Sequence, residues 1–318
     1  MRLAAELALV IILSAPLGTA NQSGAAEPPE AMVRARHAYE LARAGDTASA
    51  ITELQDACRL APRNALYRSA LGGIYERAGK LEDAVAAFSE AVKLDPANPK
   101  LAGHLESVSL DWGAALAREK RFRAGLAHAR ATADRFPQSA AAFLMLGLFE
   151  TRNQQNLAAV AAYQRALQLD PDSADASVGL AVAQSSAGLV NEAASTLEAG
   201  LQKFPRDAMH RQAYGVLLVK MTESGAASPE RAEKMLESAL ALDPSLAEAH
   251  YQLGSLALAR GDANAALQHF GTAGHNGLDD SRIHYAMARA LRRLSRNDEA
   301  EQQMELFRRR KQAESVQP

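Results

Sequence analysis

Residues 71–96 read LGGIYERAGKLEDAVAAFSEAVKLDP, and this stretch decides the fold. Its apolar residues recur at intervals of three and four, which is the spacing of amphipathic helices. Gly79 separates two such runs and is typical of the residue that ends a helix. The stretch therefore predicts two short helices joined at Gly79. A phosphate-binding loop is excluded, because Leu81 follows Lys80 where that loop needs a hydroxyl group.

The composition favours helices packed through small side chains. Of 318 residues, 48% are hydrophobic but only 5% are aromatic, whereas strands favour aromatic and β-branched residues. The formal net charge of −2 argues against a dedicated nucleic-acid binder, which must neutralise many phosphates. Cys58 is the only cysteine, so neither an intrachain disulfide nor a thiolate metal cluster can form. We expect Cys58 to be a small buried side chain rather than a reactive thiol.

The N-terminus has the order of a secretion signal. Arg2 precedes the apolar run LALVIIL, which is too short to span a bilayer, and small residues follow it. We expect residues 1–20 to be removed, with a possible second cleavage after residue 26, and residues 21–30 to form a polar spacer. The protein would then be periplasmic or secreted, without stable membrane insertion. The alternative is an uncleaved membrane anchor.

The rest of the chain repeats itself. A proline closes each of six similar segments, and three of the five gaps between these prolines are 34 residues long, the others 41 and 39. The two longer gaps contain insertions, PKLAGHL at 99–105 and ESGAASPE at 223–230. A fixed period of this size predicts helical pairs that bury their apolar faces against their neighbours. The prolines are Pro62, Pro96, Pro137, Pro171, Pro205 and Pro244.

The quoted stretch resembles a tetratricopeptide repeat, whose pattern matches at Leu71, Gly72, Tyr75, Ala84, Phe88, Ala91 and Pro96. The resemblance implies an all-α fold, a right-handed superhelical solenoid of antiparallel helix pairs. It covers residues 31–307 in about eight repeats, followed by a charged tail at 308–318. The expected repeats begin near Ala31, Ala65, Glu106, Ala140, Ala174, Ala208, Ala247 and Ser281.

Three recurring residue types are consistent with this fold. Large side chains are expected to pack against the small residues of the first helix at Phe88, Tyr163, Leu197, Leu236 and Phe270. Oxygen-bearing residues are expected to cap the next helix at Asn64, Asn98, Ser139, Ser173 and Asp207. Glycines are expected to stop first helices at Gly45, Gly79, Gly188 and Gly261. Trp112 falls on a core position of the pattern.

No catalytic, metal-binding or cofactor-binding residues are predicted. The eight histidines are scattered without a metal-ligand spacing, and no serine lies in a nucleophile elbow. His250 and His284 occupy equivalent positions in adjacent repeats, where packing is the simpler interpretation than a shared site. We expect a non-enzymatic scaffold that binds proteins or extended peptides. The alternatives are a solenoid that binds a small molecule or glycan, and an accessory subunit of an envelope enzyme or assembly machine.

The resemblance also implies where a partner binds, because the first helix of each pair lines the concave surface in this family. The apolar positions that this selects are Tyr39, Gly73, Leu110, Ala114, Leu144, Leu148, Val178, Val182, Val216, Val219, Tyr251 and Tyr285. Arg289 belongs to the same predicted groove. The family's clamp for a C-terminal carboxylate includes an asparagine that these positions lack, so we do not expect that ligand.

A row of basic residues accompanies the predicted groove, four residues beyond its central position in most repeats. Two interpretations remain open for it. The row stabilises helix C-termini, each charge contributing about 0.3–1 kcal/mol, or it selects extended partners with acidic residues beside apolar anchors. The basic row consists of Arg43, Arg77, Arg118, Arg152, Lys220 and Arg293.

Overall fold

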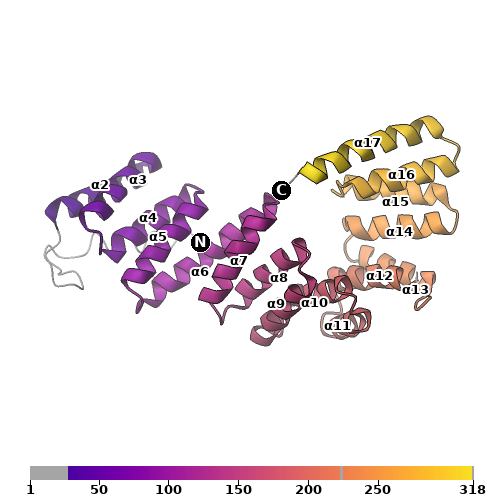
Figure 1. Cartoon of the computed structure of the whole chain (residues 1–318), viewed down its shortest axis with the longest axis horizontal. Helices are drawn as coiled ribbons and strands as arrows, with labels where there is room; N and C mark the ends of the chain where they lie inside the picture. The colour runs from indigo at the N-terminus through magenta and orange to yellow at the C-terminus, as the bar shows by residue number, and fades with distance from the viewer. Residues whose placement is uncertain (1–27, 223–224, 317–318) are drawn as a thin grey trace. The chain divides into compact units, whose positions relative to one another are not determined.

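The structure is a computed structural model that describes residues 28–222 and 225–316. Within these residues it contains sixteen α-helices and no strand, and consecutive helices pack in pairs (Figure 1). The predicted all-α fold of paired helices is confirmed. The expected signal, at residues 1–20, and most of the expected spacer lie outside the described residues.

The chain divides into two compact units, residues 1–137 and 138–318. The described helices of the N-terminal unit are α2 (Pro29–Ala44), α3 (Thr47–Leu60), α4 (Ala65–Arg77), α5 (Leu81–Leu94), α6 (Pro99–Arg118) and α7 (Phe122–Arg135). Those of the C-terminal unit are α8 (Ala140–Arg152), α9 (Asn156–Leu169), α10 (Ala174–Ser186), α11 (Val190–Lys203), α12 (Ala208–Thr222), α13 (Pro229–Leu240), α14 (Ala247–Ala259), α15 (Ala263–His275), α16 (Ser281–Arg293) and α17 (Asn297–Val316).

All five predicted caps accept hydrogen bonds from the first turn of the helix that follows. The Asn64 carboxamide oxygen accepts from the backbone N–H groups of Leu66 and Tyr67, at 2.9 and 3.2 Å. Asn98, Ser139, Ser173 and Asp207 act in the same way at the starts of α6, α8, α10 and α12. Since the first N–H groups of a helix have no partner within it, each cap fixes where a first helix begins.

The turn inside each pair uses a left-handed residue. Gly45, Gly79, Gly188 and Gly261 have φ values between 71° and 96°, as the glycine pattern predicts. Three other pairs place a residue with a side chain at the equivalent position, with φ values of 58° to 61°. These residues are Lys120, Gln154 and Ser295. A side chain in this conformation is strained, so these three turns are weaker versions of the glycine turn.

Replacing Gln154 with glycine is therefore expected to raise the free energy of unfolding by about 1 kcal/mol. Urea unfolding followed by circular dichroism measures the change. The matched control is Ala161→Gly, at an exposed position inside α9, where glycine should cost about 1 kcal/mol. Equal destabilisation by both variants would contradict the assigned turn.

Small residues of first helices receive large side chains of second helices, as the sequence predicts. A Cβ atom added at Gly72 would lie 2.8 Å from the Phe88 ring, and one at Gly254 would lie 2.6 Å from the Phe270 ring. Phe88 and Phe270 are buried. In these two pairs the close approach of the helices supplies the core, because the ring fills the space that the glycine leaves.

The two insertions lengthen the structure without interrupting the pairing. PKLAGHL extends the start of α6, which is 20 residues long and begins at Pro99 rather than near Glu106. The second insertion follows α12, which ends at Thr222, and its last two residues begin α13 at Pro229. Residues 308–316 of the expected charged tail continue α17 as a helix. The Glu314 carboxylate accepts hydrogen bonds from the Ser281 backbone N–H and hydroxyl, both at 2.7 Å, which holds this end against α16.

Two further side-chain expectations have different outcomes. Cys58 is 2% exposed, and burial raises the pKa of its thiol to about 11, so the prediction of a small buried side chain is confirmed. Trp112, expected in the core, is only partly buried. Its ring packs at 4.2 Å between centroids on His128, which is the buried member of this pair. His128 is satisfied there by the Ser109 backbone carbonyl at 2.7 Å, so it can occupy an apolar position.

Candidate partner-binding surface

The first helices of successive pairs contact one another in the C-terminal unit. α8 contacts α10, α10 contacts α12, and α12 contacts α14. Each of these helices also packs against its own second helix. One side of the three neighbouring helices α8, α10 and α12 therefore remains available to form a continuous surface.

The residues on that side recur in one register. α8 exposes Ala141, Leu148 and Arg152. α10 exposes the residues at the equivalent positions, which are Asp175, Val182 and Ser186. In α12 the equivalent residues are Met209, Val216 and Lys220. Spacings of seven and four residues keep these positions on one helical face. The shared register shows that adjacent helices present the same face.

The middle of this face is apolar. Leu148 is 36% exposed and Val182 is 43% exposed, although aliphatic side chains of this size are usually buried. Four further predicted groove residues on the same helices are partly exposed. We name this set the central apolar patch: Leu144, Leu148, Val178, Val182, Val216 and Val219.

The predicted groove residues of α14 and α16 are aromatic and carry cationic neighbours. Tyr251 is partly buried, and the Arg282 guanidinium lies 4.9 Å from the centroid of its ring. Tyr285 is 45% exposed, with the Arg289 guanidinium at 5.9 Å. Ion pairs with Glu248 and Asp280 hold Arg282 in place and raise its pKa against the opposing effect of burial. This end of the surface is thus more polar than the central apolar patch.

In the N-terminal unit, the predicted groove positions form a less continuous apolar surface. Tyr39 and Leu110 are partly buried, and Ala114 is exposed. Gly73 is buried, so the prediction that it lines the groove is wrong. The glycine over which the Phe88 ring packs within this pair is the preceding residue, Gly72.

The basic row has a structural role at three of its six positions. Arg77 donates a hydrogen bond to the Ala42 carbonyl at 3.3 Å, and Lys220 donates to the Ser185 carbonyl at 2.7 Å. Arg293 donates to the Leu258 carbonyl in the same way. In each case the acceptor lies 35 residues earlier, in the last turn of the preceding first helix. Each of these carbonyls also accepts a hydrogen bond from the backbone N–H of the glycine that follows the helix, so the basic side chain adds a second hydrogen bond at the helix end.

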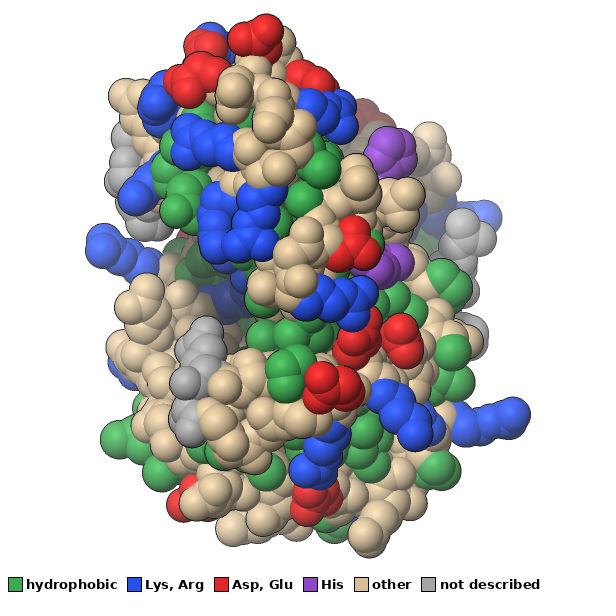
Figure 2. Space-filling model, turned by 90° about the vertical axis from the view of Figure 1, so that its right-hand side faces the viewer, with side chains coloured by type: hydrophobic (Ala, Val, Ile, Leu, Met, Phe, Trp, Pro, Cys, Tyr) green, Lys and Arg blue, Asp and Glu red, His purple; other side chains and the backbone are tan. Residues whose placement is uncertain are grey.

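The other three members of the basic row lie in different surroundings. The Arg43 guanidinium lies 5.8 Å from the centroid of the Tyr39 ring. Arg118 and Arg152 are exposed, at the last residues of α6 and α8. The face of the molecule in Figure 2 shows basic and acidic side chains mixed with hydrophobic ones, without a large area of one sign.

A buried polar relay joins two successive pairs, and sequence reasoning missed it. The His210 ring, which is 0% exposed, lies between the Asp207 carboxylate at Nδ1 and the Ser177 hydroxyl at Nε2, the latter at 3.1 Å. Asp207 accepts from Nδ1–H, which leaves Nε2 to accept from the hydroxyl. The only signal in the sequence is the separation of 33 residues between Ser177 and His210, close to the repeat period.

A serine hydroxyl, an imidazole and a carboxylate joined in this order also occur in the catalytic triads of hydrolases. The surroundings of these three groups indicate a structural role instead. Ser177 is 8% exposed. A Cβ atom added at Gly200 would lie 2.5 Å from His210 Nε2, so the imidazole is already enclosed. A nucleophile must reach its substrate, and the burial of Ser177 and His210 leaves little access to the hydroxyl. The relay therefore links α10, α11 and α12.

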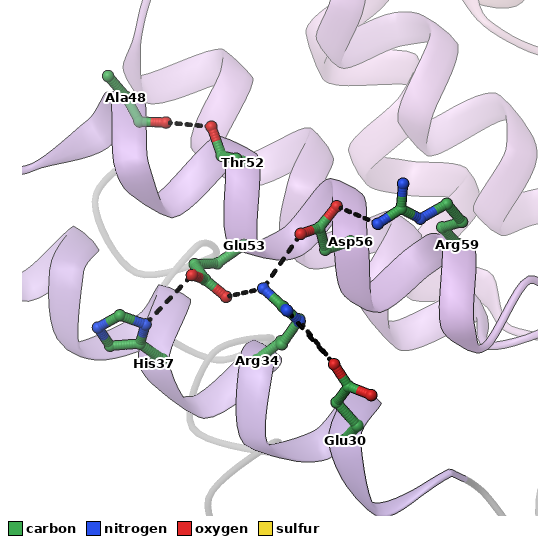
Figure 3. Close-up of polar contacts among 8 residues, drawn as sticks. All are labelled: Glu30, Arg34, His37, Ala48, Thr52, Glu53, Asp56 and Arg59. Atoms are coloured by element: carbon green, nitrogen blue, oxygen red, sulfur yellow. Dashed lines mark hydrogen bonds and ion pairs between the residues drawn. The ribbon is translucent and has the colours of Figure 1, made fainter.

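A second polar contact joins the two helices within several pairs, at residues 19 positions apart. Arg34 of α2 reaches between Glu53 and Asp56 of α3, at 3.2 and 3.1 Å (Figure 3). His284 Nδ1 donates to the Gln303 carboxamide oxygen at 2.8 Å. His250 likewise contacts His269 of its own pair. Each of the two equivalent histidines thus has its partner in its own second helix.

Among the residues that the structure describes, none of the helices combines the length and the apolar character needed to cross a bilayer.

Comparisons with known proteins agree with the helical geometry. One tetratricopeptide repeat model matches residues 36–99 and 110–174, and a second matches residues 150–217 and 225–290. No curated protein matches the chain by sequence.

Solved structures share the fold. A tetratricopeptide repeat protein from Parabacteroides merdae is 20% identical with a TM-score of 0.53, over 83% of this chain and 100% of the other. The tetratricopeptide repeat protein TTC0263 of Thermus thermophilus is 22% identical with a TM-score of 0.51, over 58% and 98%. The two family models together span most of the chain, from residue 36 to residue 290, and the chain belongs to the tetratricopeptide repeat family.

Proposed function

We propose that this protein is a non-enzymatic scaffold that binds a segment of another protein on the central apolar patch. The observation that carries this proposal is the exposure of aliphatic side chains in one register on three adjacent first helices. Such a patch is costly to leave in water and is typical of an interaction site. Tetratricopeptide repeat proteins generally mediate protein–protein interactions, which supports this assignment.

The ends of the patch favour one kind of partner. Arg152 and Lys220 lie at the C-terminal ends of α8 and α12, and Lys220 uses one of its three N–H donors for the Ser185 carbonyl. The exposed acidic residue on these three helices is Asp175, near the opposite end of α10. We propose an extended segment with aliphatic anchors over the patch and acidic residues toward Arg152 and Lys220, so that apolar burial provides affinity and charge sets the register.

The proposal places this interaction in the periplasm or outside the cell. Its support is the order of residues 1–20, in which a charged residue, an apolar run and small residues follow one another as in a secretion signal.

A double variant tests the patch. Leu148→Ser with Val182→Ser removes two exposed apolar side chains, so the double variant should still fold. The amount of partner protein that it captures from an envelope extract should fall at least tenfold. The measurement is affinity capture with quantitative mass spectrometry. The control is Leu157→Ser, which removes an equally apolar residue that is 69% exposed on the second helix α9. Equal capture by both variants would exclude the patch as the binding site.

The same capture across a salt series tests the basic residues. Arg152→Gln with Lys220→Gln should weaken binding and flatten its salt dependence, because fewer charge contacts remain to be screened. Arg77→Gln is the matched control, since Arg77 makes the same helix-end contact as Lys220 in the other unit. An unchanged salt dependence would leave the basic row with its structural role alone.

A further inference from the structure

The polar position shared by several pairs is occupied in one pair by two imidazoles. His250 of α14 and His269 of α15 face each other, with 3.2 Å between their Nδ1 atoms and 5.5 Å between their ring centroids. Both rings are partly buried. The next pair has His284 and Gln303 in the same positions, 34 residues further along. The two pairs therefore differ at this position in one side chain, which is the imidazole of His269 in the first pair and the carboxamide of Gln303 in the second.

The surrounding hydrogen bonds fix the proton positions. The Pro244 carbonyl accepts from His250 Nε2 at 3.2 Å, so Nε2 carries the hydrogen and Nδ1 of a neutral His250 carries a lone pair. The same carbonyl accepts from the Asn276 side-chain amide at 3.2 Å, which holds it in position. His269 Nδ1 then donates to His250 Nδ1. One proton lies between two nitrogens that are each a possible metal ligand.

We propose that His250 and His269 bind one divalent transition-metal ion through their Nδ1 atoms. The hydrogen that they share moves to His269 Nε2, so that both rings bind the ion as neutral imidazoles. Zinc lies about 2.0–2.1 Å from a histidine nitrogen, so two such nitrogens at right-angled or tetrahedral positions are about 2.9–3.4 Å apart. The observed 3.2 Å falls within this range. Imidazole suits zinc, copper and nickel, and the backbone contact at His250 Nε2 is the kind of support that orients a metal-binding histidine.

The surroundings allow a cation at this position. Glu233 and Glu237 of α13 act electrostatically on His269 and favour positive charge, whereas Arg260 opposes it. The Glu233 carboxylate holds Arg260 at 2.7 and 2.8 Å, which partly offsets that charge. The described residues contain no group of three or more histidine, cysteine or acidic residues arranged for a metal, so water would complete the coordination.

The next pair provides the control variants. His269→Gln reproduces the arrangement of His284 and Gln303, so the polar contact is kept while one metal ligand is removed. Gln303→His makes the opposite change and places two imidazoles in that pair. Calorimetric titration of the purified chain with zinc chloride at pH 7.5, in a non-chelating buffer, measures the number of bound ions and their affinity. Circular dichroism checks that each variant folds.

We expect one bound ion for the natural chain, at least tenfold weaker binding for His269→Gln, and two bound ions for Gln303→His. Acidification to pH 5.5 should weaken binding in the natural chain, since protons compete for the same nitrogens. Two results would overturn the proposal. One is equal zinc affinity of the natural chain and His269→Gln, which would assign binding to the other histidines. The other is a Gln303→His variant that folds and gains no ion.

Discussion

Replacing Phe270 with alanine is expected to lower the free energy of unfolding by about 3–5 kcal/mol. The ring is 0% exposed and fills the space over Gly254, so its removal leaves a cavity between α14 and α15. Because each pair contacts only its neighbours, the loss should be concentrated in α14 to α16. Urea unfolding measures the magnitude, and amide hydrogen exchange locates it.

A substitution at Gly254 tests the same contact with the Phe270 ring. Gly254→Ala should destabilise the natural chain, because its Cβ atom would lie 2.6 Å from the Phe270 ring. In the Phe270→Ala background the same change should stabilise, since the clash is gone and alanine favours a helix by about 1 kcal/mol over glycine. Gly271→Ala is the control, as a Cβ atom there meets nothing within 4 Å. The same effect of Gly254→Ala in both backgrounds would show that the two residues do not pack together.

Replacing His210 with alanine is expected to cost about 2–4 kcal/mol. The change leaves a buried cavity and removes the partner of the Ser177 hydroxyl, which the rest of the pair encloses. Ser177→Ala should cost about 1 kcal/mol, because it removes one hydrogen bond and leaves no charge unpaired. Thermal and urea unfolding compare the two variants.

The same residues provide a check on the structural interpretation. If the relay only holds α10 to α12, a fluorophosphonate probe should not label Ser177 in the folded chain. Labelling of Ser177 that disappears in His210→Ala, with little loss of stability, would contradict the structural role and indicate a reactive serine.

Much of the fold follows from local sequence signals. Caps such as Asn64 and stops such as Gly79 depend on one residue and its immediate neighbours, so their chemistry is visible in the sequence. The pairing of Gly72 with Phe88 is equally regular, because both recur at fixed positions in the repeat. The period then identifies which helices are neighbours.

Other features depend on contacts between repeats. Leu146 matches the core position that Leu71 and Leu253 occupy, yet it is only partly buried, whereas they are 5% exposed. The partners of Arg77 and His210 lie 35 and 33 residues away, and no local pattern selects a carbonyl or a hydroxyl at that distance. The apolar residues of the predicted groove were identifiable by register, but their exposure depends on how adjacent first helices pack.

Site-specific photo-crosslinking is a direct test of whether a partner segment binds on the central apolar patch. A photoreactive amino acid at Val182 samples the patch, and one at Leu157 samples an exposed apolar site on a second helix. After irradiation in intact cells, we expect a discrete crosslinked protein at position 182 and none at position 157. Crosslinking at position 157 alone, or to the same proteins at both positions, would contradict the claim.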